Sequence, residues 1–67
     1  MLLKYIGEDE IDLTPNQIYK AKKINDKWGE CYSIFDEGED WYIYGLNYVK
    51  KNFEEVEETP ENIRQAV

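Results

Sequence analysis

Short apolar runs alternate with polar turns along the chain. Apolar and aromatic side chains recur within residues 2–6, 17–24, 30–35, 40–44 and 52–56, and the segments between them contain Gly, Pro, Asn or Asp. Those four residue types end strands and form tight turns. No internal repeat and no low-complexity segment interrupts the pattern. The spacing predicts five short strands.

Alternation within the runs predicts which side chains share a face of the sheet. In the second run, Tyr19 and Ala21 fall on one face, and Lys20 and Lys22 on the other. A second lysine directly before Ile24 breaks the alternation, which predicts a bulge near residues 22–23.

Two later runs predict faces in the same way. In residues 30–35, Tyr32 and Ile34 share a face. In residues 40–44, Trp41 and Ile43 lie on one face and Tyr42 and Tyr44 on the other, with either pair able to point inward.

The turns carry their own conformational signals. Asn16 follows Pro15 and tolerates a left-handed backbone, and Gly38 supplies the positive φ expected in the hairpin at 36–39. Residues 46–49 predict one helical turn before the last strand. Thr59 either caps a short helix that ends at Gln65 or belongs to a frayed terminus. We therefore divide the chain into a domain at 1–57 and a tail or short helix at 58–67.

Five short strands leave no room for two full sheets, so we expect an all-β fold: a small, five-stranded antiparallel barrel. The chain has 67 residues, and aromatic side chains make up 15% of it. Each ring buries roughly 150–250 Å². Aromatic burial therefore allows so short a chain to form a core, although some rings must remain exposed.

The order of elements is that of an SH3-like barrel with one helical turn before its last strand. The string Leu-Thr-Pro-Asn-Gln-Ile-Tyr at 13–19, the Tyr-Ser-Ile strand at 32–34, the Asp-Glu-Gly hairpin at 36–38 and Phe-Glu at 53–54 carry the likeness. The chain resembles small SH3-like barrel proteins from phages and prophages of Gram-positive bacteria, over residues 3–56. The Ala-Leu-Tyr-Asp-Tyr string of eukaryotic peptide-binding SH3 domains is absent, so binding of proline-rich peptides is not implied.

Composition excludes several classes of function. The chain has no histidine, which removes histidine metal ligands, catalytic triads and a histidine general base. Cys31 is the single cysteine, so we expect a small buried apolar residue, with no intrachain disulfide and no thiolate zinc site. The hairpin acids at 36–40 lack the ligand spacing of a calcium loop. We expect no enzyme activity, no catalytic residue, no bound metal and no cofactor.

The formal net charge of −7 is distributed unevenly. Twelve of the fifteen acids fall within residues 8–12, 36–40 and 54–58. Such a chain repels phosphate backbones but attracts a basic protein. We expect a protein-interaction module of the bacterial cytoplasm that modulates a basic host protein through acidic loops and exposed aromatic rings. The candidate interaction residues are Glu8, Asp9, Glu10, Asp12, Trp28, Asp36, Glu37, Glu39, Asp40, Trp41, Tyr44 and Tyr48.

A lysine strip supports one alternative, which is direct binding of nucleic acid with an aromatic ring stacked on a base. Its residues are Lys20, Lys22, Lys23, Lys27 and Trp28. A second alternative is an orphan structural domain that is monomeric or a weak homodimer paired through edge strands. No run of about 18 apolar residues is present, so we expect no membrane span.

Overall fold

The computed structural model describes residues 1–27 and 29–66. It contains five strands and two short helices. In chain order they are β1 (Leu2–Tyr5), β2 (Ile18–Asp26), β3 (Gly29–Phe35), β4 (Trp41–Gly45), α1 (Leu46–Asn52), β5 (Phe53–Val56) and α2 (Pro60–Gln65). The five predicted strands are confirmed, and the predicted helical turn is confirmed as a helix that extends to Asn52.

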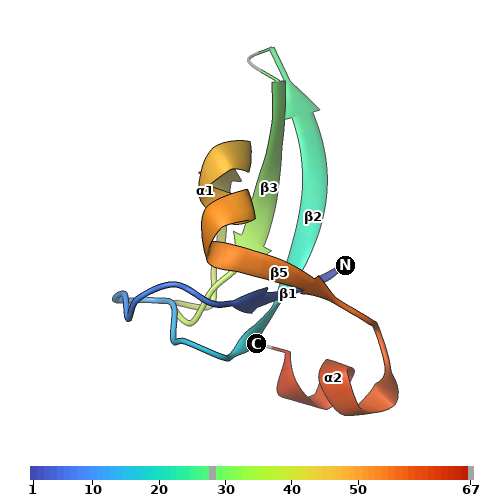
Figure 1. Cartoon of the computed structure of the whole chain (residues 1–67). Coiled ribbons are helices and arrows are strands. Elements are labelled where there is room, and N and C mark those ends of the chain that lie inside the picture. The colour runs from blue at the N-terminus through green and yellow to red at the C-terminus, as the bar shows by residue number, and fades with distance from the viewer. Residues whose placement is uncertain (28, 67) are drawn as a thin grey trace.

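All five strands belong to one antiparallel sheet, in the order β4-β3-β2-β1-β5. Within the described residues, β4 pairs only with β3, and β5 pairs only with β1. The sheet is strongly bent, so that β1 and β5 run across the lower part of β2 and β3 (Figure 1). It keeps two free edges and is not closed, so the predicted closure into a barrel is not found.

The long β2–β3 hairpin keeps an unbroken register. Partners run from Ala21 opposite Ile34 to Asp26 opposite Gly29, one residue against one. The bulge predicted near residues 22–23 is therefore wrong. This end of the hairpin extends beyond the core (Figure 1), so Lys23 can stand on the same face as Ala21 and still reach water. Its Nζ lies 3.5 Å from Oε1 of Glu30.

The core lies between the sheet and α1. Phe53 is at its centre, with its ring centroid 5.1 Å from that of Tyr5, 6.3 Å from Tyr44 and 6.4 Å from Tyr48. Such tilted ring pairs stabilise a small core beyond the area that they bury. The buried members are Leu3, Tyr5, Leu13, Tyr19, Ala21, Ile34, Val49 and Phe53.

The predicted faces agree with the structure in β3, whereas in β4 neither predicted pair of side chains points inward as a whole. Ile34 is buried and Tyr32 packs against the core from the same face, as predicted. Tyr44 also faces the core, whereas Trp41, Tyr42 and Ile43 are all exposed. Cys31 is buried, as predicted, and carries a free thiol. Thus only the end of β4 nearest α1 contributes to the core.

Among the non-glycine residues that the structure describes, positive φ angles occur at one predicted residue and at one that was not predicted. Asn16 has φ 72°, as expected after Pro15, but in the hairpin the left-handed residue is Glu39, with φ 58°, and not Gly38. The Asp36 carboxylate accepts from the Gly38 N–H at 3.0 Å, and the Asp36 carbonyl accepts from the Glu39 N–H at 3.0 Å. These two bonds move the left-handed position one residue later.

Of the two predictions for the C-terminal segment, a short helix or a frayed terminus, the structure has the helix. The Thr59 hydroxyl accepts from the Asn62 N–H at 3.2 Å, which caps α2. Ala66 then forms a parallel bridge to Ile18, so α2 is held beside β2. Among the described residues, no helix combines the length and the apolar character needed to cross a membrane.

Candidate functional site

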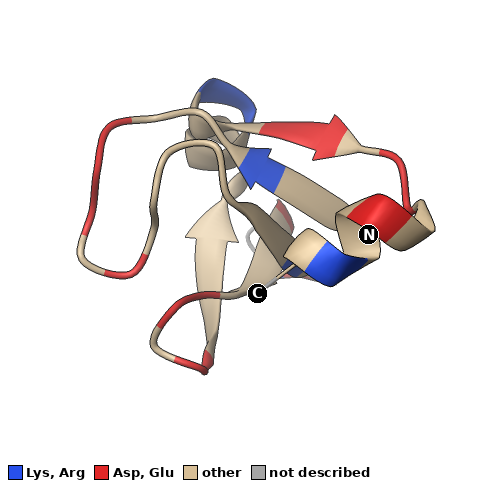
Figure 2. Ribbon diagram, turned by 90° about the horizontal axis from the view of Figure 1, so that it is seen from below, with Lys and Arg blue, Asp and Glu red and all other residues tan. Residues whose placement is uncertain are grey.

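Two of the three acidic segments lie side by side, although they are more than twenty residues apart in sequence. The Asp12 carbonyl accepts from the Glu37 N–H at 3.0 Å, which joins the β1–β2 loop to the hairpin between β3 and β4. A Cβ placed on Gly38 would lie 3.3 Å from an Asp12 carboxylate oxygen. The third segment, in and after β5, lies apart from these two loops (Figure 2).

Two acids of this group hold the loops together from inside. Asp36 is only 1% exposed, and its carboxylate accepts from the Gly38 N–H and from the Tyr44 hydroxyl at 3.4 Å. Glu37 accepts a hydrogen bond from the Tyr19 hydroxyl, which itself accepts from the Thr14 N–H at 2.7 Å. Asp36 is therefore out of reach of a partner, and the Glu37 carboxylate is already hydrogen-bonded.

Burial and hydrogen bonding shift the pKa values of these two acids in opposite directions. Burial, followed by the nearby charge of Asp12, raises the pKa of Asp36, and the Gly38 bond opposes that rise only in part. Hydrogen bonds from Thr14 and then Tyr19 lower the pKa of Glu37. The ionised form is thus disfavoured at Asp36 and favoured at Glu37.

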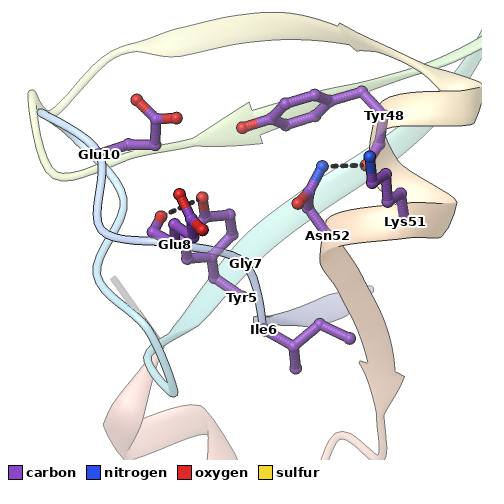
Figure 3. Close-up of a pocket in the computed structure, with 8 residues that line it drawn as sticks. All are labelled: Tyr5, Ile6, Gly7, Glu8, Glu10, Tyr48, Lys51 and Asn52. Carbon is purple, nitrogen blue, oxygen red and sulfur yellow. Dashed lines mark hydrogen bonds between the residues drawn. The ribbon is translucent and has the colours of Figure 1, made fainter.

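A cleft of about 490 Å³ opens between the acidic β1–β2 loop and α1. Figure 3 shows Glu8 and Glu10 on the loop side, facing Tyr48, Lys51 and Asn52 of the helix. A second cleft of about 290 Å³ is its neighbour and shares Glu10 and Tyr48 as lining residues. Its other lining residues are Ile11, Asp12, Leu13 and Tyr44.

Two stacked aromatic rings belong to the lining of this double cleft. Tyr44 and Tyr48 stack with their ring centroids 5.5 Å apart and their planes 20° from parallel. Both rings line the second cleft, and Tyr48 also lines the first. The lining thus combines carboxylates with aromatic rings, and both kinds of group attract a cation.

Close packing at Gly7 fixes the loop against the helix. The Ile6 N–H donates to the Asn52 carbonyl at 2.7 Å, and a Cβ added to Gly7 would lie 2.6 Å from the Asn52 side-chain oxygen. Asn52 in turn donates to the Tyr48 carbonyl at 3.0 Å. The Tyr5 hydroxyl donates to the Glu8 carbonyl. The cleft therefore has a fixed width at this end.

The negative charges of the β1–β2 loop affect the pKa values of tyrosines that line the clefts. The pKa of Tyr5 is raised to about 12, first by burial, then by its contact with Tyr48 and by the negative charges of Glu10 and Glu8. Burial and the charge of Asp36 also raise the pKa of Tyr44. Both phenols stay neutral at ordinary pH, so the charges at the cleft come from the carboxylates and from Lys51 alone among the lining residues.

The remaining candidate residues lie elsewhere. Glu39 and Asp40 are exposed at the hairpin, and Asp9 is exposed in the β1–β2 loop. Trp41 is on the other face of the sheet, 5.4 Å from the Phe35 ring centroid, with Lys22 Nζ 4.6 Å above its own ring. Trp28 lies outside the described residues.

The lysines of the nucleic-acid alternative do not share one face. Lys20 and Lys22 alternate with Lys23 along β2, so the first two point to one side of the sheet and Lys23 to the other. Lys22 is placed over Trp41, and Lys23 is paired with Glu30. Lys27 follows β2 in the turn.

The sequence analysis selected five of the twelve residues that line the two clefts. It selected Glu8, Glu10, Asp12, Tyr44 and Tyr48, which the fold brings together. It missed the other seven lining residues, and only two of these, Lys51 and Asn52, have a positional signal in the sequence. Lys51 and Asn52 stand three and four residues after Tyr48, a spacing that puts them on the same face of a helix. The missed residues are Tyr5, Ile6, Gly7, Ile11, Leu13, Lys51 and Asn52.

No group of three or more acidic or cysteine side chains within residues 1–27 and 29–66 is arranged to hold a metal ion. Comparison with protein-family models, with curated proteins and with solved structures finds no match to this chain.

Proposed function

We propose that this protein is a non-catalytic interaction module that binds a basic segment of a protein partner in the double cleft. A cationic side chain of the partner lies on the stacked Tyr44 and Tyr48 rings and pairs with the carboxylates of Glu8 and Glu10. The observation that carries the proposal is that the two clefts share an acid and an aromatic ring, Glu10 and Tyr48, as lining residues.

The chemistry favours arginine over lysine as the bound residue. A guanidinium is planar, stacks on aromatic faces and donates to carboxylates in a fork, whereas an ammonium is a compact and strongly hydrated charge. Lys51 lines the far side of the first cleft and repels a second cation there. Asp9, Glu39 and Asp40 are exposed in the same two acidic loops, outside the cleft lining, and their negative charge speeds the encounter with a basic partner.

The fold and the setting belong to the same proposal. We propose that the open sheet is a variant of the SH3-like barrel. The strand order β5-β1-β2-β3-β4, the long β1–β2 loop and the helix before the last strand support this relationship. In line with the resemblance to phage proteins, the partner is a basic protein of the bacterial host and the site of action is its cytoplasm.

Peptide titration tests the proposal. A short peptide with two arginines among neutral residues is titrated into the protein and followed by NMR, beside the same peptide with lysine or glutamine in place of arginine. We expect shifts at residues that line the clefts, the order arginine, lysine, glutamine for affinity, and weaker binding at high salt.

Charge-matched variants locate the site. Glu10→Gln should weaken arginine-peptide binding about two- to fivefold, in the range of one exposed ion pair of up to about 1 kcal/mol. Glu61→Gln removes the same charge from α2, outside both clefts, and should leave the affinity nearly unchanged. Equal loss in both variants, or equal affinity for the glutamine peptide, refutes a specific site at the clefts.

A further inference from the structure

The two free edges of the sheet are protected very differently. β5 carries Glu54 and Glu55 at its centre, both exposed, and charged residues of this kind prevent another strand from adding to an edge. β4 reads Trp-Tyr-Ile-Tyr-Gly and contains no charge. Three of its side chains are exposed, by 40% at Trp41, 51% at Tyr42 and 64% at Ile43. An exposed apolar edge strand without a protecting charge is a template for pairing.

The backbone of β4 offers hydrogen bonds on its free side. The Asp36 N–H donates to the Asp40 carbonyl at 3.1 Å, which sets the phase of the β3–β4 ladder. Because the bonded pairs of an antiparallel ladder alternate, Tyr42 and Tyr44 bond toward β3, and Trp41, Ile43 and Gly45 direct their backbone groups outward. The outward Trp41 N–H is already capped by Asp40 Oδ1 at 2.9 Å. The outward groups of Ile43 and the Gly45 N–H are placed to bond a further strand.

We infer that β4 pairs with β4 of a second copy of this chain, antiparallel and with the two-fold axis at Ile43. The inferred sites are the backbone of Ile43, which bonds reciprocally with its equivalent, and the Gly45 N–H, which donates to the Trp41 carbonyl of the other copy. This step goes beyond the proposed function and does not rest on it.

The register is self-complementary in shape and in charge. It places Trp41 of one copy opposite Gly45 of the other, and a Cβ added at Gly45 would meet no atom within 4 Å, so the indole has room. An aromatic ring opposite an edge glycine covers the exposed backbone there. Tyr42 comes opposite Tyr44, and no charged residue of β4 faces another. The antiparallel arrangement also puts the two acidic hairpins at opposite ends of the paired strands.

Net charge makes the response to salt diagnostic. Each copy carries −7, so the two copies repel each other except along the neutral strand. Added salt screens that repulsion, with a Debye length of about 10 Å at 0.1 M and about 3 Å at 1 M. The dimer therefore strengthens with salt, whereas binding of a basic peptide at the clefts weakens. The two associations can be distinguished in one series of buffers.

Sedimentation equilibrium of the whole chain tests the inference, from about 10 μM to about 1 mM, where weak interfaces associate. We expect the mass to rise from 8.0 kDa toward twice that value, and to rise at lower concentration in high salt. Amide exchange at Ile43 should slow as the dimer forms. A wild-type chain that stays at 8.0 kDa throughout, in low and high salt, overturns the inference.

Two variants locate the interface. Gly45 has φ −65°, the value that proline requires, so Gly45→Pro fits the monomer, removes the outward N–H and fills the space for Trp41. Ile43→Lys adds an edge charge at an exposed position. Both should stay at the monomer mass. Ile11→Lys makes the same change at a loop residue that is 96% exposed and should still dimerise.

Each remaining outcome decides the question. A dimer that persists in both β4 variants refutes the register. If Gly45→Pro loses its circular dichroism signal, Ile43→Lys alone gives the answer. A wild type that stays monomeric and binds the arginine peptide refutes the dimer and supports the proposed function. A wild type that dimerises and does not bind the peptide supports the dimer and refutes the proposed function.

Discussion

Asp36 is an acidic side chain that the fold has withdrawn from water. The sequence places it among the acids of the hairpin, where a solvated carboxylate is the ordinary expectation. The structure makes it 1% exposed and hydrogen-bonds it to the Gly38 N–H and the Tyr44 hydroxyl. Its role is to tie the hairpin to β4. Such a role depends on side chains that meet only after folding, so the local pattern contains no signal for it.

The raised pKa of Asp36 predicts a pH-dependent effect of the Asp36→Asn change. Because the folded state disfavours the ionised carboxylate, the stability that Asp36 contributes is full below its ordinary pKa of 3.8 and is lost as pH rises through the raised value. Asparagine can still accept from Gly38 and carries no charge. Relative to the wild type, Asp36→Asn should therefore be more favourable to folding at pH 7 than at pH 3.

Urea unfolding of both chains at the two pH values measures this difference. Glu37 has a lowered pKa, so its contribution to the free energy of unfolding is present above pH 4.5 and is lost as pH falls through the lowered value. This loss is the same in the wild type and in Asp36→Asn. The comparison between the chains cancels it. A free-energy difference between wild type and Asp36→Asn that is identical at pH 3 and pH 7 rules out a raised pKa at Asp36.

The β3–β4 hairpin shows how a turn can be predicted in place but misassigned in detail. Its position follows from Asp and Gly between two apolar runs, and the structure has it there. The left-handed residue is Glu39 because the Asp36 side chain accepts from the Gly38 N–H and the Asp36 carbonyl accepts from the Glu39 N–H. Gly38 is instead valuable for its missing Cβ, which would lie 3.2 Å from an Asp36 carboxylate oxygen.

This assignment predicts opposite effects of two substitutions in the turn. Glu39→Gly removes the left-handed cost of a side chain, about 1–2 kcal/mol, against a smaller entropic loss, and should raise the free energy of unfolding by up to about 1 kcal/mol. Gly38→Ala forces the Asp12 and Asp36 carboxylates to give way and should lower it. Thermal unfolding of the two variants decides, and a stabilised Gly38→Ala chain contradicts the assigned roles.

Secondary structure was predictable here because each element has a local cause. The β-branched and aromatic runs, the Pro15–Asn16 turn and the Thr59 cap each act within a few residues. The prediction of a bulge in β2 was wrong for a reason that lies outside that strand. A lysine on the core-side face is tolerated where the hairpin extends past the core, and nothing in the strand itself indicates where the core ends.

At the scale of the whole molecule, the type of sheet could be predicted from the sequence, but its closure could not. The count of strands and their antiparallel pairing follow from the spacing of the runs, but closure of the sheet depends on whether its edges meet, and β4 and β5 do not pair. The same holds for the charge. The sequence shows three acidic segments, and only the fold brings the first two together through the contact of Asp12 with Glu37. The cleft could not be predicted because it joins that loop to α1.

We propose different partners for two regions of the surface. The acidic loops and the Tyr44–Tyr48 pair suit a cation, and the neutral edge of β4 suits another strand. The β4 backbone lies at the margin of the sheet, whereas the clefts lie against α1. The two regions meet at Tyr44, which belongs to β4 and also lines the second cleft, so in the proposed dimer the first cleft is the one that lies clear of the paired strands.

The proposed function requires Glu10 and Tyr48 to act on the same bound cation, and a double-mutant cycle measures this directly. Affinity for the arginine peptide is determined by calorimetry for the wild type, Glu10→Gln, Tyr48→Leu and the double variant, at low salt and with folding checked by circular dichroism. Two groups that share one ligand charge should be coupled, so the double variant loses less affinity than the sum of the single losses, by about 0.5 kcal/mol or more. Strictly additive losses, or no loss in either single variant, would show that the cleft does not bind a cation in this way.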